Sequence, residues 1–263
     1  MNILAALLLL LSPPNGIIHY GEEIVSSEEM LEMLDDAPVV FVGEKHDDPL
    51  AHEWELFIWT NIASENRSLA LEMFETDVQD ILNGYAAGEL SLDEFLESAR
   101  PWSNYTQDYS PMVEFAVQND FDIIAANVPR HFAADVARGG WQGLRETDGS
   151  DFFDSISVDS TNNFYRQRFL ETMQAVGNQM QAMPVDPLNM YRAQLLKDAV
   201  MASSIRGIRC MFVCGGFHSD YHSGIPDQLD SDVSYLTVSV VAEDESWETA
   251  DQADFVIVRE ILF

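Results

Sequence analysis

Six short apolar runs alternate with segments of helical periodicity along most of this chain, and that alternation constrains the fold more than any other feature. Apolar runs this short and continuous are typical of strands that are covered on both faces. The alternation predicts an α/β fold with a mixed, mostly parallel β-sheet flanked by helices. The expected strands are residues 39–42, 68–73, 122–128, 209–214, 234–241 and 254–259. The expected helices are residues 27–35, 48–65, 76–87, 91–99, 111–119 and 130–138.

A long stretch between the early and the late strands carries no strand pattern. From about residue 159 to residue 206 the sequence reads as two helices separated by Met183 and Pro184. This stretch predicts a helical insertion before the last strands. With 263 residues in all, we expect residues 17–263 to form one α/β domain with that insertion.

The first residues form an unbroken apolar run from Ile3 to Leu11. The run is too short to span a bilayer and is typical of a signal-peptide core, although no Lys or Arg precedes it and no A-x-A motif follows. We therefore expect residues 1–16 to be a signal peptide and the mature chain to have no transmembrane span. Export to the periplasm or cell envelope follows from that prediction. The alternative is a short buried helix, which would leave the protein in the cytoplasm.

The charge balance is strongly acidic, with 13 Lys and Arg against 45 Asp and Glu and a net charge of −32. Such a surface repels nucleic-acid phosphates and anionic lipid head groups, so the sequence argues against nucleic acid as a partner. An acidic, halophilic surface, whose self-repulsion is screened by cations at high salt, is the favoured interpretation. A specific cationic partner is the alternative.

Two of the predicted strands end in the same motif, G-x-x-H. Gly43 to His46 follows the apolar run "VVFV", and Gly215 to His218 follows "MFVC". Ligands of open α/β sheets bind beyond the carboxyl ends of the strands, and glycine allows a sharp exit from a strand there. We therefore expect His46 and His218 to meet at one edge of the sheet.

A third strand carries a carboxylate, Glu72, where an apolar side chain would be usual. A buried carboxylate is costly unless it is paired or coordinated, so Glu72 is a candidate to join the histidines. His46, Glu72 and His218 together suit a divalent transition metal such as Mn, Co or Zn, and they would be the catalytic groups of a hydrolase. The alternative is two histidines that cap loops and a Glu72 that pairs with Arg130.

Several motifs together resemble the ChaN-like haem-binding uptake family of the Tiki/TraB superfamily. They are "GEKHDD", "LALEMFE", "YAAGELSLDEFL", "DYSPMVEFA", "IIAANVPRHFAADVARGG", "AQLLKDAVMASSI" and "GGFHSDYHSGIP", and they run from about residue 38 to residue 229. The resemblance implies haem bound through a tyrosine, with two haems held in a homodimer, and an outer-membrane haem receptor or transporter as partner. The Tiki branch implies instead a metal-dependent peptidase that uses His46, His218 and Glu72.

Phenolate is a hard donor that suits ferric iron, so the resemblance directs attention to tyrosines. The candidates are Tyr85, which small residues flank, and Tyr109, with Tyr85 preferred. Arg130 and His131 are candidates to neutralise haem propionates, whereas Tyr221 is expected to belong to the site at the strand ends. The first hypothesis is thus a haem-binding protein of haem and iron uptake, without enzymatic activity. The second is a metal-dependent hydrolase, and the third is an interaction protein with neither activity.

Overall fold

The computed structural model describes residues 12–179, 186–243 and 251–259. The apolar run of the expected signal peptide lies outside these described residues. Within them, no helix combines the length and the apolar character needed to cross a membrane.

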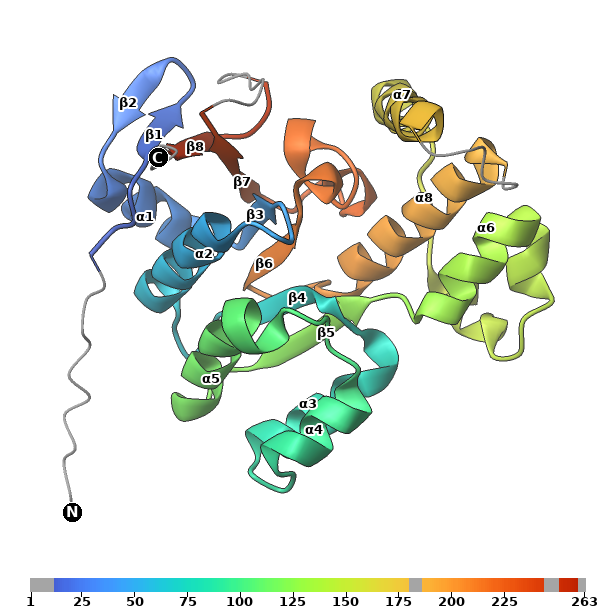
Figure 1. The fold of residues 1–263 in the computed structure, drawn as a ribbon, viewed down its shortest axis with the longest axis horizontal. Coiled ribbons are helices and arrows are strands. Elements are labelled where there is room, and N and C mark those ends of the chain that lie inside the picture. The colour runs from blue at the N-terminus through green and yellow to red at the C-terminus, as the bar shows by residue number, and fades with distance from the viewer. Residues whose placement is uncertain (1–11, 180–185, 244–250, 260–263) are drawn as a thin grey trace.

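The core of the structure is one sheet of eight strands in the order β2-β1-β8-β7-β3-β6-β4-β5 (Figure 1). Strands β3 to β8 pair in parallel, whereas β1 pairs antiparallel with both β2 and β8. The prediction of a mixed, mostly parallel sheet is therefore confirmed. The strands are β1 (Ile17–Tyr20), β2 (Glu23–Val25), β3 (Val39–Glu44), β4 (Ser68–Glu75), β5 (Ile123–Asn127), β6 (Cys210–Gly215), β7 (Tyr235–Ala242) and β8 (Phe255–Arg259).

All six expected strands are present, but the hairpin β1–β2 was not predicted. Its strands have four and three residues and lie at the edge of the sheet, where most of their side chains are exposed or half-buried. Strands so short and so little buried carry too few alternating positions for a reliable pattern.

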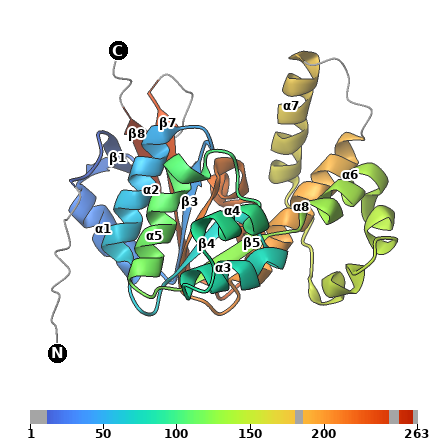
Figure 2. The ribbon, with the colours of Figure 1, turned by 60° about the horizontal axis from the view of Figure 1, so that its bottom comes forward.

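Five helices cover one face of the sheet (Figures 1 and 2). Their apolar side chains share a single core with those of Val40, Leu71 and Val213 from three strands. Ser91 and Glu94 form a capping box, in which the Ser91 side chain accepts from the backbone N–H of Glu94 and the Glu94 carboxylate accepts from the backbone N–H of Ser91. The five helices are α1 (Ser27–Asp36), α2 (Pro49–Ile62), α3 (Gln79–Ala86), α4 (Leu92–Ala99) and α5 (Ser110–Gln118).

Three further helices follow β5 and precede β6, and they stand at the side of the sheet away from the β1–β2 hairpin (Figure 1). The end of the third packs against the second face of the sheet, where Met201 meets Phe41 and Phe212. The buried, unpaired Cys210 and Cys214 belong to the same cluster. The helices are α6 (Arg130–Arg145), α7 (Asn163–Gln179) and α8 (Pro187–Ser204).

One buried guanidinium connects the end of α1 with the chain just before β3. Arg67, 1% exposed, donates hydrogen bonds to the carbonyl oxygens of Leu34, Asp35 and Ala37 at distances of 3.3, 2.9 and 3.0 Å. These carbonyls lie at the end of α1 and just before β3. Burial and, next, the charge of the neighbouring Arg209 lower the pKa of Arg67 to about 10, so the side chain remains charged at neutral pH.

Replacing Arg67 with methionine should destabilise the fold by about 3 kcal/mol, because the buried carbonyl groups of Leu34 and Ala37 would lose this donor. The free energy of unfolding, measured in urea, checks this. The exposed Arg145 of α6 provides the control, since Arg145→Met should change stability by less than about 0.5 kcal/mol. Equal effects of the two substitutions would contradict a structural role for Arg67.

Candidate functional site

The three central strands bring His46, Glu72 and His218 to one edge of the sheet. Strand β6 lies between β3 and β4, and its last residue, Gly215, pairs with Glu44 of β3. Both histidines therefore leave the sheet from neighbouring strands, and Glu72 comes from the strand on the other side of β6. The order of the strands, rather than closeness in sequence, assembles this group.

Glu72 is held by a backbone N–H group that does not take part in the pairing of β4 with β6. The pairing of β4 with β6 ends at Leu71 and Val213, and the Glu72 Oε2 atom accepts a hydrogen bond from the Gly215 N–H at 2.8 Å. The other oxygen, Oε1, lies 3.3 Å from His218 Nε2. Burial alone would raise the pKa of Glu72, but the charge and hydrogen bond of His218, together with the charge of His46, hold it below its usual value. Glu72 is therefore a carboxylate.

His218 is fixed from behind by a carboxylate of the helical insertion. Its Nδ1 atom lies 2.5 Å from Asp198 Oδ1, and Asp198 Oδ2 accepts a hydrogen bond from the Tyr165 hydroxyl at 2.7 Å. Burial would lower the pKa of His218, but Glu72 and Asp198 raise it to about 9. The sequence analysis did not identify Asp198. Its position three residues after Leu195, among the buried residues of a helix, was the signal in the sequence that could have identified it.

His46, like His218, has a carboxylate next to its Nδ1 atom. Its Nδ1 atom lies 2.9 Å from Glu44 Oε1, and its ring packs edge-on against Trp102 at 4.3 Å between centroids. A methyl group placed on Gly215 would lie 2.9 Å from His46 Nε2 and 3.7 Å from Glu72 Oε2, so only glycine lets the ring approach. Metal-binding histidines commonly have a carboxylate on the other ring nitrogen, as both of these do.

The two tyrosines proposed as iron ligands are both engaged by carboxylates. Tyr109 is 1% exposed, and its hydroxyl donates to Glu44 Oε1 at 2.5 Å. Burial and Glu44 raise the pKa of Tyr109 far above its usual value. Tyr85 stacks on Phe95 and donates to Glu114, and burial together with Glu114 raises its pKa to about 12. Both environments oppose the phenolate that iron binding requires.

Arg130 and His131 begin α6, just after the end of β5. The Arg130 Nε atom pairs with Glu75 Oε1 at 2.5 Å, and Glu75 also pairs with Arg100 at 3.1 Å. The alternative in which Arg130 pairs with Glu72 is therefore wrong. His131 is exposed and packs against Phe132 at 4.0 Å between centroids.

A groove of about 760 Å³ lies between α7 and the loop that follows β6. Tyr221, expected among the histidines, lines this groove instead, with φ of +60°, and the next residue, His222, has φ of +51°. Two adjacent non-glycine residues in the left-handed region are uncommon and store backbone strain, which often marks functional sites. Phe164 meets the Tyr221 ring edge-on at 5.4 Å, and the Arg168 guanidinium lies 4.9 Å from it.

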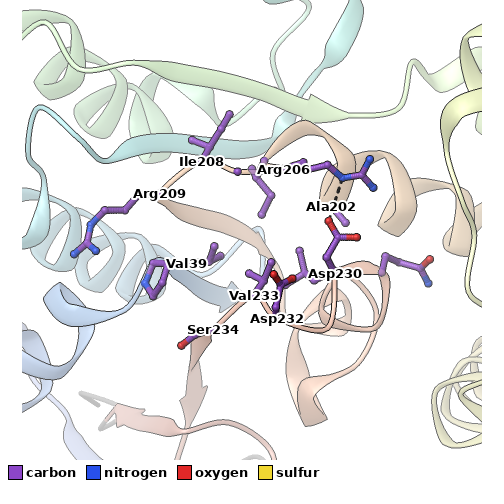
Figure 3. A pocket seen from close by; sticks show the side chains of 14 residues that line it. Val39, Ala202, Arg206, Ile208, Arg209, Asp230, Asp232, Val233 and Ser234 are labelled. Atoms are coloured by element: carbon purple, nitrogen blue, oxygen red, sulfur yellow. Dashed lines mark ion pairs between the residues drawn. The ribbon is translucent and has the colours of Figure 1, made fainter.

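A second, smaller pocket of about 370 Å³ lies at the opposite edge of the sheet (Figure 3). It is lined by residues at the amino ends of the central strands, Val39, Arg209 and Ser234, and by the ion pair of Arg206 with Asp230. Its position separates it from the histidines, which follow the carboxyl ends.

The fold is similar to that of one solved structure in particular, and two others match less well. The structure of ChaN of Campylobacter jejuni, described as showing cofacial haem binding, has a TM-score of 0.72 and 17% identity, covering 92% of this chain and 96% of that one. An erythromycin esterase mutant, EreC H289N in its open conformation, gives a TM-score of 0.49 with 11% identity over 94% of this chain and 83% of that one. The type III effector HopBA1 gives 0.44 with 11% identity over 88% and 91%.

A search of curated protein sequences finds no match. A family model, in contrast, matches residues 30–229, which include both G-x-x-H motifs, Glu72 and Asp198. Its description is haem-binding uptake, Tiki superfamily, ChaN. The chain belongs to this family.

Proposed function

We propose that this protein binds haem and serves in haem and iron uptake. The observation that carries the proposal is membership of the haem-binding ChaN family over residues 30–229. The fold agrees over nearly the whole chain with that of the Campylobacter jejuni ChaN, for which cofacial haem binding is described.

We place the haem in the groove beside α7, with Tyr221 as the iron ligand. Phe164 and Tyr221 give the groove the aromatic surface that a flat macrocycle requires, and its volume is typical of ligand sites. The Arg168 guanidinium, 4.9 Å from the centre of the Tyr221 ring, offers positive charge near the propionates. We prefer Tyr221 to Tyr85 and Tyr109 because Tyr221 lines this groove and the other two do not.

The remaining parts of the proposal concern assembly and location. We propose that a second copy of the chain covers the exposed face of the haem in a homodimer that holds two haems. Export to the cell envelope, and transfer of haem to or from an outer-membrane receptor or transporter, fit such a role. The size of the purified protein with and without haemin tests the dimer.

Haemin titration followed by the visible spectrum tests the ligand. Wild-type protein should shift the Soret band, and Tyr221→Phe should weaken haemin binding at least tenfold, about 1.4 kcal/mol, because the iron loses its anionic ligand. Tyr85→Phe and Tyr109→Phe are the controls and should bind as the wild type does. If Tyr85→Phe alone weakened haemin binding, Tyr85 rather than Tyr221 would be the iron ligand. The absence of a Soret shift with wild-type protein would refute haem binding.

A metal-dependent hydrolase, of the peptidase type, is the second candidate. The observation that favours it is that the Nδ1 atoms of both imidazoles face carboxylates, while His218 Nε2 lies 3.3 Å from Glu72 Oε1 and His46 lies against Gly215, whose N–H donates to Glu72. His46, Glu72 and His218 would hold the metal, and the metal would polarise a carbonyl group and activate water. Glu44 and Asp198 would keep the two rings in place.

Gly215→Ala tests this candidate, since the added methyl group would push His46 away from Glu72. Wild-type protein should cleave peptides when Mn²⁺ or Co²⁺ is added, and Gly215→Ala should lose at least about 90% of that activity, like His218→Ala. Gly139→Ala is the matched control, because nothing lies within 4 Å of its added methyl group. No cleavage by wild-type protein with either metal would refute the hydrolase candidate.

A further inference from the structure

A second group of ligating side chains lies next to His46, whose ring contacts Glu44 and whose carbonyl contacts His52. Glu44 ends β3, and His52 and Glu55 lie on one face of α2, three residues apart. All three are buried, with exposures of 5, 4 and 0%. One ligating atom of each lies within 4.8 Å of the others, and no other group of three or more in the described part of the chain meets that criterion.

His52 is oriented as a ligand rather than as a simple bridge. Its Nε2 atom lies 3.2 Å from the carbonyl oxygen of His46, a group that only accepts, so Nε2 carries a hydrogen. That hydrogen bond turns Nδ1 toward the two carboxylates, 3.0 Å from Glu44 Oε2 and 2.9 Å from Glu55 Oε2. Histidines that bind metals are held in this way, with the other nitrogen on a carbonyl or carboxylate oxygen.

The carboxylates have more acceptor capacity than their neighbours satisfy. Glu44 Oε2 and Glu55 Oε1 are buried and receive no hydrogen bond, because a doubly protonated His52 has one hydrogen on Nδ1 and directs it at Glu55 Oε2. A cation bound by Nδ1 would replace that hydrogen. Two carboxylates this close repel each other, and a buried oxygen without a donor is costly. A divalent cation among these atoms would remove both penalties at once.

We propose that Glu44, His52 and Glu55 bind a divalent first-row transition cation, of the Mn²⁺ or Zn²⁺ class, in the interior of the domain. One imidazole nitrogen and two carboxylates are ligands that these ions accept, and the two negative charges balance the ion. The proposal is independent of haem binding and of a metal at Glu72.

The inner site, Glu44, His52 and Glu55, shares one residue with the surroundings of the outer group, His46, Glu72 and His218. Glu44 offers one oxygen to the inner group, while its other oxygen contacts His46 Nδ1 and the Tyr109 hydroxyl. A cation held by Glu44 therefore fixes the carboxylate that orients His46. Glu44 serves both groups, so it is unsuitable for a test that must separate them.

Mn²⁺ binding to protein stripped of metal, measured by electron paramagnetic resonance, tests the inner site. We expect Glu72→Gln, which disables the outer group, to leave one Mn²⁺ bound per chain. Adding Glu55→Gln should then weaken binding at least about tenfold. Adding Glu53→Gln instead, an exposed glutamate on the same helix, should change nothing. No bound Mn²⁺ in Glu72→Gln, or equal binding with and without Glu55→Gln, would overturn the proposal.

A second measurement needs no substitution at a buried position. Wild-type crystals soaked in Mn²⁺ should show an anomalous difference peak between Glu44, His52 and Glu55. Peaks confined to the outer group or to surface carboxylates would overturn the inner site even if Glu55→Gln failed to fold. Haemin titration of the same protein tests the haem proposal separately, because the Soret shift does not require a cation at the inner site.

Discussion

The parallel pairing of β6 between β3 and β4 is the constraint on which the rest of this molecule depends. It sets two strand ends side by side and leaves the N–H of Gly215 without a strand partner at the point where β4 stops pairing. Glu72 accepts a hydrogen bond from that N–H, which puts a carboxylate beside His218, and His46 lies against the same Gly215. A shift of one residue in either pairing would turn these side chains to the other face of the sheet.

Much of the fold was predictable because its elements are encoded locally. Short apolar runs identified the six parallel strands, and glycine followed by histidine after two of them indicated which edge to inspect. The β1–β2 hairpin was missed, since so few of its residues are buried. Helix α6 continues to Arg145, past the expected end at residue 138, because the chain resumes its helical course after Gly140, where φ is +62°.

The partners of the site residues were less predictable, because they depend on how distant elements pack. Asp198 reaches His218 only when α8 lies across the second face of the sheet. Glu55 looks like any acidic residue on α2 until β3 places Glu44 opposite it. Tyr221 follows His218 by three residues, yet a backbone in the left-handed region directs it outward to the groove. Sequence spacing indicated which residues matter but not which way each one faces.

The hydroxyl of Tyr165 joins two regions that have so far been treated separately. Tyr165 follows Phe164, which lines the groove, and it donates to Asp198, which holds His218. A guest molecule that displaces α7 must therefore disturb the support of an imidazole on the sheet. By thermodynamic reciprocity, whatever is bound by that imidazole must alter the affinity for the guest by the same factor. A molecule in the groove and an ion at His218 would then change each other's affinity through the hydroxyl of Tyr165.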